Sequence, residues 1–154
     1  MSNSNAPLPV NPPMPCAEGN SSAILAAIRA GLAESPETVN LIAASLRSCA
    51  GGLRLGQSGR ALETLGQAVG NLTLLAELVS GLRSGLARLN LDSAPLASWD
   101  SCAEIFKGVV DALERRDWVL LSDLIEYELC PTLEETEREM TALRERLTGI
   151  APGW

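Results

Sequence analysis

The chain contains no histidine in its 154 residues. Histidine is the most common general base at neutral pH and the most common metal ligand in proteins. Serines and cysteines are present, but without an imidazole base no nucleophile–base pair can be assembled. The glycines of 51–59 lack the lysine of a phosphate-binding loop and follow no predicted strand. We therefore expect a protein that is not an enzyme, with no catalytic, cofactor-binding or metal-binding residues.

Basic residues are also few, because 12 lysines and arginines stand against 19 acidic residues and leave a net charge of −7. This balance argues against nucleic acid as a partner and against anionic membrane surfaces. No apolar run approaches the roughly 20 residues of a membrane span. We also expect no small-molecule substrate.

The four cysteines are widely spaced, and no signal peptide is evident at the N-terminus. The cysteines indicate reduced thiols in a cytoplasmic protein. Their positions are Cys16, Cys49, Cys102 and Cys130.

Aromatic residues make up only 3% of the chain, although 46% of its residues are apolar. The core must therefore consist mainly of leucine, alanine, valine and isoleucine, which favours packed helices over short strands. We expect an all-α fold, an up-down bundle of four or five helices, as one domain over residues 20–150. Residues 1–19 hold five of the nine prolines, which predicts a disordered tail. A proline-rich docking peptide is the functional alternative for this tail.

Apolar spacing and capping signals predict the helix ranges. Ser35 and Pro36 match an N-cap followed by proline at the first helical position, and so predict a break between two helices. The expected helices are 22–33, 36 to within 51–59, 60–89, 95–116 and 117–147. In the fourth, Leu96, Trp99, Phe106 and Val110 are expected to face the core. The glycine pairs 66/70 and 81/85 indicate either close helix contacts or a weakness that packing tolerates.

The fifth predicted helix is apolar on more than one side. One stripe forms the core face, and its members are Trp118, Leu121, Ile125, Leu129, Thr132, Thr136, Met140, Leu143 and Leu147. A second stripe consists of Leu120, Leu124, Tyr127 and Pro131. Either this helix is central in the bundle, or the second stripe is a partner or dimer surface. Pro131 predicts a kink, or a break with Thr132 and Glu135 as a capping box for a new helix.

Glutamates flank the core face of the same helix, among them Glu126, Glu128 and Glu135. Helical bundles hold di-metal sites with Glu-x-x-His motifs and further glutamates. Because histidine is absent and the other helices offer no matching inward acids, we interpret these carboxylates as solvated charge.

The segment VVDALERRDWVLLSDLIEYELCPTLEE, from Val109 to Glu135, resembles a group of uncharacterised bacterial helical proteins. Their pattern is A-L-x-x-x-D-(W/Y)-V-x-L-(A/S)-D-(L/I)-(L/I)-E-Y-E-(L/I)-x-P, and their genes often lie near flagellar or surface-glycan genes. The ALERRDWVLLSDL hairpin is more distantly similar to flagellar export chaperones, which are small, acidic, cytoplasmic helical bundles. The motif positions in this sequence are Asp117, Trp118, Asp123, Glu126, Tyr127, Glu128 and Pro131.

The resemblance implies a protein–protein interaction module, with a chaperone or accessory factor for flagellar or surface-export proteins as its more specific form. The alternative is a self-associating structural helical-bundle protein. In either case the expected partner-binding residues are Leu120, Asp123, Leu124, Glu126, Tyr127, Glu128 and Pro131.

Overall fold

The computed structural model describes residues 17–91 and 95–150, and this part of the chain is all-α. Four continuous helical segments follow one another, which confirms the expected fold class. The first three are α1 (Ala17–Arg54), α2 (Ser58–Arg88) and α3 (Ser98–Glu114). The fourth joins α4 (Trp118–Asp123), the π-helical η1 (Leu124–Leu129) and α5 (Cys130–Thr148) without interruption.

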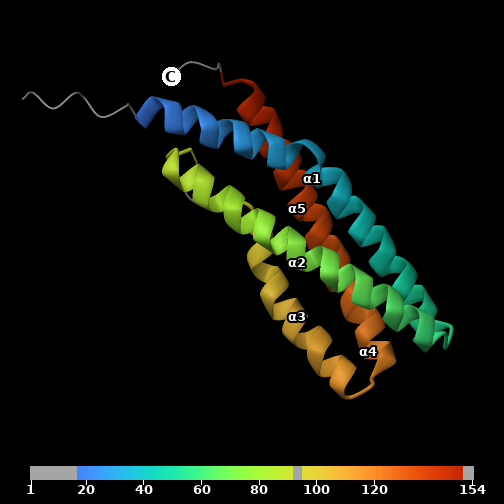
Figure 1. Cartoon of the computed structure of the whole chain (residues 1–154). Helices are drawn as coiled ribbons and strands as arrows, with labels where there is room; N and C mark the ends of the chain where they lie inside the picture. Colours follow the sequence, from blue (N-terminus) through green and yellow to red (C-terminus); the bar gives the residue numbers. More distant parts are fainter. Residues whose placement is uncertain (1–16, 92–94, 151–154) are drawn as a thin grey trace, which may run out of the picture.

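Helix α1 is the centre of the arrangement, because it packs against α2 on one side and against α4, η1 and α5 on another. Helix α3 packs against α4, η1 and α5. Figure 1 shows α1 and α2 as one long hairpin, with α5 crossing behind it and the α3–α4 hairpin at the lower end. The core is aliphatic, as the composition predicts, and leucine is its most common residue.

Side chains of the fourth segment bind backbone carbonyls of α1 in antiparallel order. Ser122 Oγ donates to the Ala50 carbonyl at 3.1 Å, and Arg144 Nη1 to the Ala33 carbonyl at 3.2 Å. At the far end, Arg29 Nη2 reaches back to the Leu147 carbonyl at 2.7 Å. Helical carbonyls at a C-terminus lack partners within the helix, so Arg29 both caps α5 and fixes its register on α1.

The predicted helix break at Ser35 and Pro36 is wrong, because α1 runs through both residues. Pro36 is buried, and the Ser35 hydroxyl donates to the Gly31 carbonyl one turn back instead of capping a new helix. Proline removes one N–H from the helical ladder and bends the helix. Figure 1 shows α1 changing direction where its colour passes from blue to teal. Packing on both sides holds this bent helix together.

The proline-rich tail was expected to end at residue 19, but α1 already begins at Ala17. The rest of that prediction, residues 1–16, lies outside the described residues.

Helix α2 contacts α1 through a seam with alternating spacings of four and three. Its buried residues are Ala61, Leu65, Ala68, Leu72, Leu75, Val79, Leu82 and Leu86. Of the four glycines noted in the sequence, Gly85 makes a close approach, since a Cβ there would lie 2.9 Å from Ile28 Cδ1. A Cβ at Gly66, Gly70 or Gly81 would meet nothing within 4 Å. Close helix contact therefore explains Gly85 but not the other three.

By length and composition, α2 could cross a membrane, and among the described helices it alone meets that test. No such span was expected from the sequence, because no uninterrupted apolar run is long enough. The test of length and composition allows uncharged polar residues, and α2 has no charged residue between Thr64 and Ala76. A core helix of a soluble protein meets the same test.

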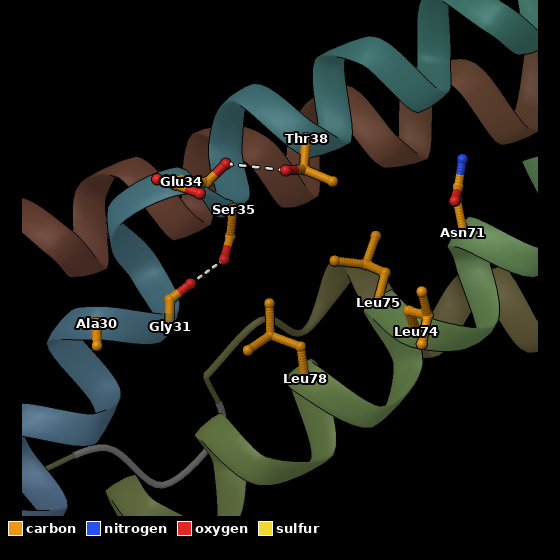
Figure 2. A pocket seen from close by; sticks show the side chains of 9 residues that line it. All are labelled: Ala30, Gly31, Glu34, Ser35, Thr38, Asn71, Leu74, Leu75 and Leu78. Atoms are coloured by element: carbon orange, nitrogen blue, oxygen red, sulfur yellow. Dashed lines mark hydrogen bonds between the residues drawn. The ribbon is translucent and has the colours of Figure 1, made fainter.

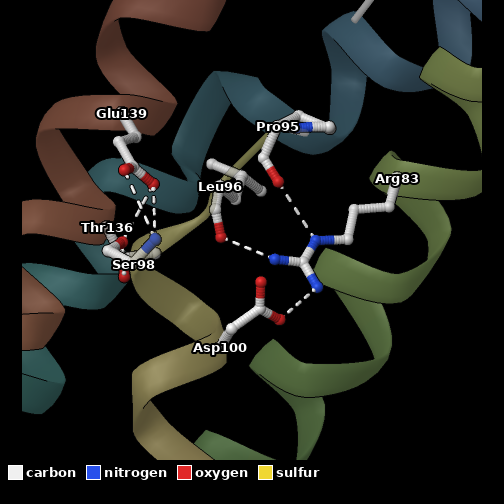
Figure 3. Close-up of polar contacts among 7 residues, drawn as sticks. All are labelled: Arg83, Pro95, Leu96, Ser98, Asp100, Thr136 and Glu139. Atoms are coloured by element: carbon white, nitrogen blue, oxygen red, sulfur yellow. Dashed lines mark hydrogen bonds and ion pairs between the residues drawn. The ribbon is translucent and has the colours of Figure 1, made fainter. Parts of the chain in front are cut away.

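The connection into α3 is held by Arg83 of α2. Its guanidinium donates to the carbonyls of Pro95 and Leu96, at 3.1 and 2.7 Å, and pairs with Asp100 at 2.9 Å (Figure 3). Leu96 is buried and has a φ of 57°, a conformation that leucine rarely adopts. This turn delays the start of α3 to Ser98, three residues after the predicted start at Pro95.

The predicted core face of α3 is also displaced. Its buried residues are Cys102, Ile105, Val109 and Ala112, whereas Val110 is exposed. Trp99 and Phe106, which suggested the face, are only partly buried at its edge. Small residues such as Ala112 and Gly108 let α3 approach the next helix closely, so the largest side chains do not mark the centre of the contact.

Candidate functional site

Six of the seven expected partner-binding residues lie on α4 and η1, and Pro131 lies in the first turn of α5. Asp117 begins this segment as predicted: its carboxylate accepts a hydrogen bond from the Leu120 N–H at 3.0 Å. This is an N-cap, which stabilises the first turn.

Pro131 does not break the helix, so the predicted alternative of a second helix with its own capping box is wrong. Thr132 Oγ1 instead donates to the Glu128 carbonyl, one turn back, at 2.8 Å. The six residues before Cys130 form η1, a π-helical segment. A π-helix bonds each N–H to the fifth residue back, and the Cys130 N–H bonds to the Ile125 carbonyl.

The spacing of the buried residues explains the π-helical segment. Leu121, Ile125, Leu129 and Leu133 are each four residues apart, and all are at most 1% exposed. In an α-helix three successive steps of four drift around the axis, because a turn takes 3.6 residues. The wider π turn keeps these four residues on one side. The prediction that Thr132 faces the core is wrong, because the π turn shifts the register and Leu133 is buried instead.

The second apolar stripe divides into two parts. Leu120 is 41% exposed, Tyr127 is 66% exposed, and Pro131 is exposed as well. We call these three residues the outer ridge. Leu124 is only partly buried but packs towards α3, where a Cβ at Gly108 would lie 3.3 Å from its Cδ1. Leu124 therefore belongs to the α3 contact and not to the outer ridge.

The acids beside the outer ridge bind a residue, Arg54, that was not predicted from the sequence. Arg54, in the last turn of α1, pairs with Asp123 at 3.0 Å and with Glu126, and its guanidinium carbon lies 5.6 Å from the centre of the Tyr127 ring. The hydrogen bonds that Arg54 donates to both carboxylates raise its pKa above the usual value. The sequence signal was weak, because α1 was expected to end anywhere within residues 51–59.

Further exposed apolar side chains surround this region. Val119 is 72% exposed next to Leu120, and Leu55 is 76% exposed next to Arg54. Glu128 is exposed on η1. The acids from Asp117 to Glu128 number four, and this segment contains no basic residue. The surface thus combines apolar side chains with negative charge.

A concave feature lies between α1 and α2 beside Pro36. It is a groove of about 280 Å³ with mostly apolar walls. Figure 2 shows Leu74, Leu75 and Leu78 of α2 facing Gly31 and Ser35 of α1 across it. Glu34 is its one ionisable lining residue. The hydroxyls of Ser35 and Thr38 donate to carbonyls of their own helix, so they serve the helix and not the groove.

The buried thiols have the character of core residues. Cys49, Cys102 and Cys130 are free and buried. Burial raises the pKa of Cys102 to about 11, and it also raises the pKa of Cys49 and Cys130. Because the thiolate is the reactive form, these cysteines are unreactive at neutral pH. Among residues 17–91 and 95–150, no group of three or more Cys, Asp or Glu side chains could hold a metal ion.

The chain matches the model of a family described as a domain of unknown function, DUF8042, over residues 32–139. The match covers more than half of the chain, which therefore belongs to this family. It spans α1 from Leu32 to the middle of α5 and includes all seven expected partner-binding residues. No curated protein and no solved structure matches the chain.

Proposed function

We propose that this chain is a non-enzymatic protein–protein interaction module of the cytoplasm, and that it binds its partner through the outer ridge and the acids beside it. The observation that carries the proposal is the exposure of Leu120 and Tyr127 on a segment whose opposite side is fully buried. Tyrosine is enriched where interfaces gain most of their binding energy, because its ring is large and its hydroxyl polar.

The local backbone conformation also favours a functional role for this surface. π-helical turns occur frequently at functional sites, and η1 carries Tyr127 and two of the expected acids. The free thiols described above are compatible with a reducing compartment. As the more specific form of this proposal, the chain is a chaperone or accessory factor for flagellar or surface-export proteins. That form is supported by the resemblance of the Val109–Glu135 segment.

The test is capture of partners from a lysate of the source organism, followed by mass spectrometry. We would compare the wild type with a Leu120→Asp/Tyr127→Glu variant and with Leu41→Asp as a matched control. Leu41 is 72% exposed on α1, outside the surface. The proposal expects one partner that the wild type and Leu41→Asp retain and the double variant loses. It fails if the double variant, shown to be folded by circular dichroism, retains every protein that the wild type retains.

Self-association through the outer ridge is the second candidate, because the same exposed apolar residues could meet their copies across a two-fold axis. Light scattering of the same three proteins separates the candidates. A wild-type dimer that becomes a monomer in the double variant, but not in Leu41→Asp, favours self-association. A monomer in all three leaves the outer ridge available to another partner.

A further inference from the structure

Three groups of the fourth helical segment converge on one guanidinium. Asp123 and Glu126 bind two different nitrogens of Arg54, and the ring of Tyr127 lies beneath its central carbon. Arginine is suited to such a site because its planar fork pairs with carboxylates while its face stacks on an aromatic ring. In this structure the arginine comes from α1 of the same chain.

This internal contact is easily replaced. The side chains of Arg54 and Asp123 are 39% and 50% exposed, and exposed ion pairs contribute little to stability. Exchange of Arg54 for another arginine would therefore leave the packing of α1 on α4 intact. That packing depends on buried contacts such as the Ser122 hydrogen bond to the Ala50 carbonyl.

The surface around the site is apolar and negatively charged. Val119, Leu120 and Tyr127 supply exposed apolar area, and the segment from Asp117 to Glu128 has four acids and no base. A helix that is apolar on one face and basic on its flanks complements both properties. An acidic or neutral helix would match the apolar part alone.

We infer that the partner presents a basic amphipathic helix, and that one of its arginines replaces Arg54 on Asp123, Glu126 and Tyr127. This inference rests on the proposed function, because it names the chemistry of the partner at the same surface. Arg54 then acts as an internal competitor, which keeps the acids paired until a partner with both apolar and basic side chains arrives.

If Arg54 competes with the partner's arginine, substitution of Arg54 and substitution of the two acids should change the affinity for the partner in opposite directions. Arg54→Met removes the competitor and should tighten binding about three- to tenfold, as expected for two exposed ion pairs. Asp123→Asn/Glu126→Gln removes the carboxylate charges and should weaken binding about tenfold or more. A surface that recognises apolar side chains alone would show neither change.

Tyr127 is the single tyrosine of the chain, so labelling with 3-fluorotyrosine gives one ¹⁹F resonance at the site. The probe is an 18-residue helical peptide with leucines on one face and arginines on its flanks. Its matched control carries glutamine in place of each arginine. We expect the arginine peptide to shift the resonance saturably and the glutamine peptide to bind at least about tenfold more weakly. Leu120→Asp should weaken binding of the arginine peptide, and Leu41→Asp should not.

The inference is overturned if the arginine peptide leaves the resonance unchanged, or if it binds the wild type and Asp123→Asn/Glu126→Gln equally well. Equal binding to the wild type and Arg54→Met overturns the competitor role. If the lysate partner depends on Leu120 and Tyr127 but not on the two acids, the proposed function stands and the arginine exchange fails. If the peptide results hold while no lysate partner depends on the ridge, the arginine site stands and the proposed function fails.

Discussion

At the scale of single residues, Gly85 and Gly81 of α2 should respond oppositely to alanine. A glycine in a helix costs about 0.5–1 kcal/mol relative to alanine. Nothing lies within 4 Å of a Cβ at Gly81, so Gly81→Ala should raise the free energy of unfolding by about that amount. In the Gly85→Ala variant the new Cβ would lie 2.9 Å from buried Ile28. This overpacking should lower the free energy of unfolding by about 1–3 kcal/mol. Urea unfolding of both variants is the measurement, and equal effects would contradict the close α1–α2 contact.

A second residue-scale prediction concerns Cys102 and alkaline pH. Its pKa is about 11 in the folded chain and 9.0 for an ordinary cysteine. Below pH 9 the thiol is protonated in both states, and its contribution to stability is complete. Between pH 9 and 11 only the unfolded thiol loses its proton, so stability falls as the pH rises. Cys102→Ala should reduce the slope with which the free energy of unfolding falls as the pH rises. The reduction corresponds to at most about one proton in the difference between the protons bound by the folded and unfolded states. Urea midpoints between pH 8 and 11 measure it, and an unchanged slope would refute the assignment.

At the scale of helical elements, η1 behaves as one residue inserted into an otherwise regular helix. Ser122 and Cys130 are buried as well, but the central line of buried residues from Leu121 to Leu147 is spaced 4, 4, 4, 3, 4, 3 and 4; its members are Leu121, Ile125, Leu129, Leu133, Thr136, Met140, Leu143 and Leu147. Deleting Glu128, which is exposed, changes this to 4, 3, 4, 3, 4, 3 and 4, the spacing of a continuous α-helical seam. Pro131 must be changed as well, because proline inside an α-helix costs about 3 kcal/mol.

The expected result is that Glu128 deletion with Pro131→Ala keeps the free energy of unfolding within about 2 kcal/mol of the wild type, the range of ordinary single changes. Deleting Arg138, which is also exposed but lies within α5, is the matched control. That deletion rotates every later core residue away from α1 and should cost several kcal/mol, as loss of buried leucines does. Equal stability of the two deletions would show that η1 is not a register insertion. If the Glu128 deletion is stable but no longer binds the partner, η1 serves the proposed function and not the fold.

Helices and caps that follow from neighbouring residues could be predicted from the sequence, whereas contacts between distant residues could not. The extent of α2, expected over 60–89 and found over Ser58–Arg88, and the cap at Asp117 could be predicted because each follows from the local sequence. The continuity of α1 could not, since Ser35 and Pro36 give a strong local start signal that two packed neighbours override. The outer ridge was visible as a second stripe. Its partner Arg54 was not, because the contact joins residues 69 and 72 positions apart.

At the scale of the whole molecule, the helices have unequal support. Helix α1 packs against α2 and against the fourth helical segment, and in addition Arg29 ties it to the end of α5. Among the described residues, α1 is the only helix against which α2 packs along its length, although Arg83 links α2 to the turn before α3. The outward face of α2 also carries three exposed glycines, at positions 66, 70 and 81.

This inequality predicts the order in which the helices open. Regions with few buried contacts and weak helix formers open at lower free energy than the core. Hydrogen exchange followed by mass spectrometry should therefore show faster exchange in the middle of α2, residues 64–81, than in the middle of α1, residues 39–50. Gly66→Ala/Gly81→Ala should slow exchange in α2 while leaving α1 nearly unchanged, because neither new methyl group touches α1. Equal exchange in the two helices would mean that the α1–α2 hairpin opens as one unit. In that case the packing of α2 on α1 would be as strong as the packing of α1 on α5.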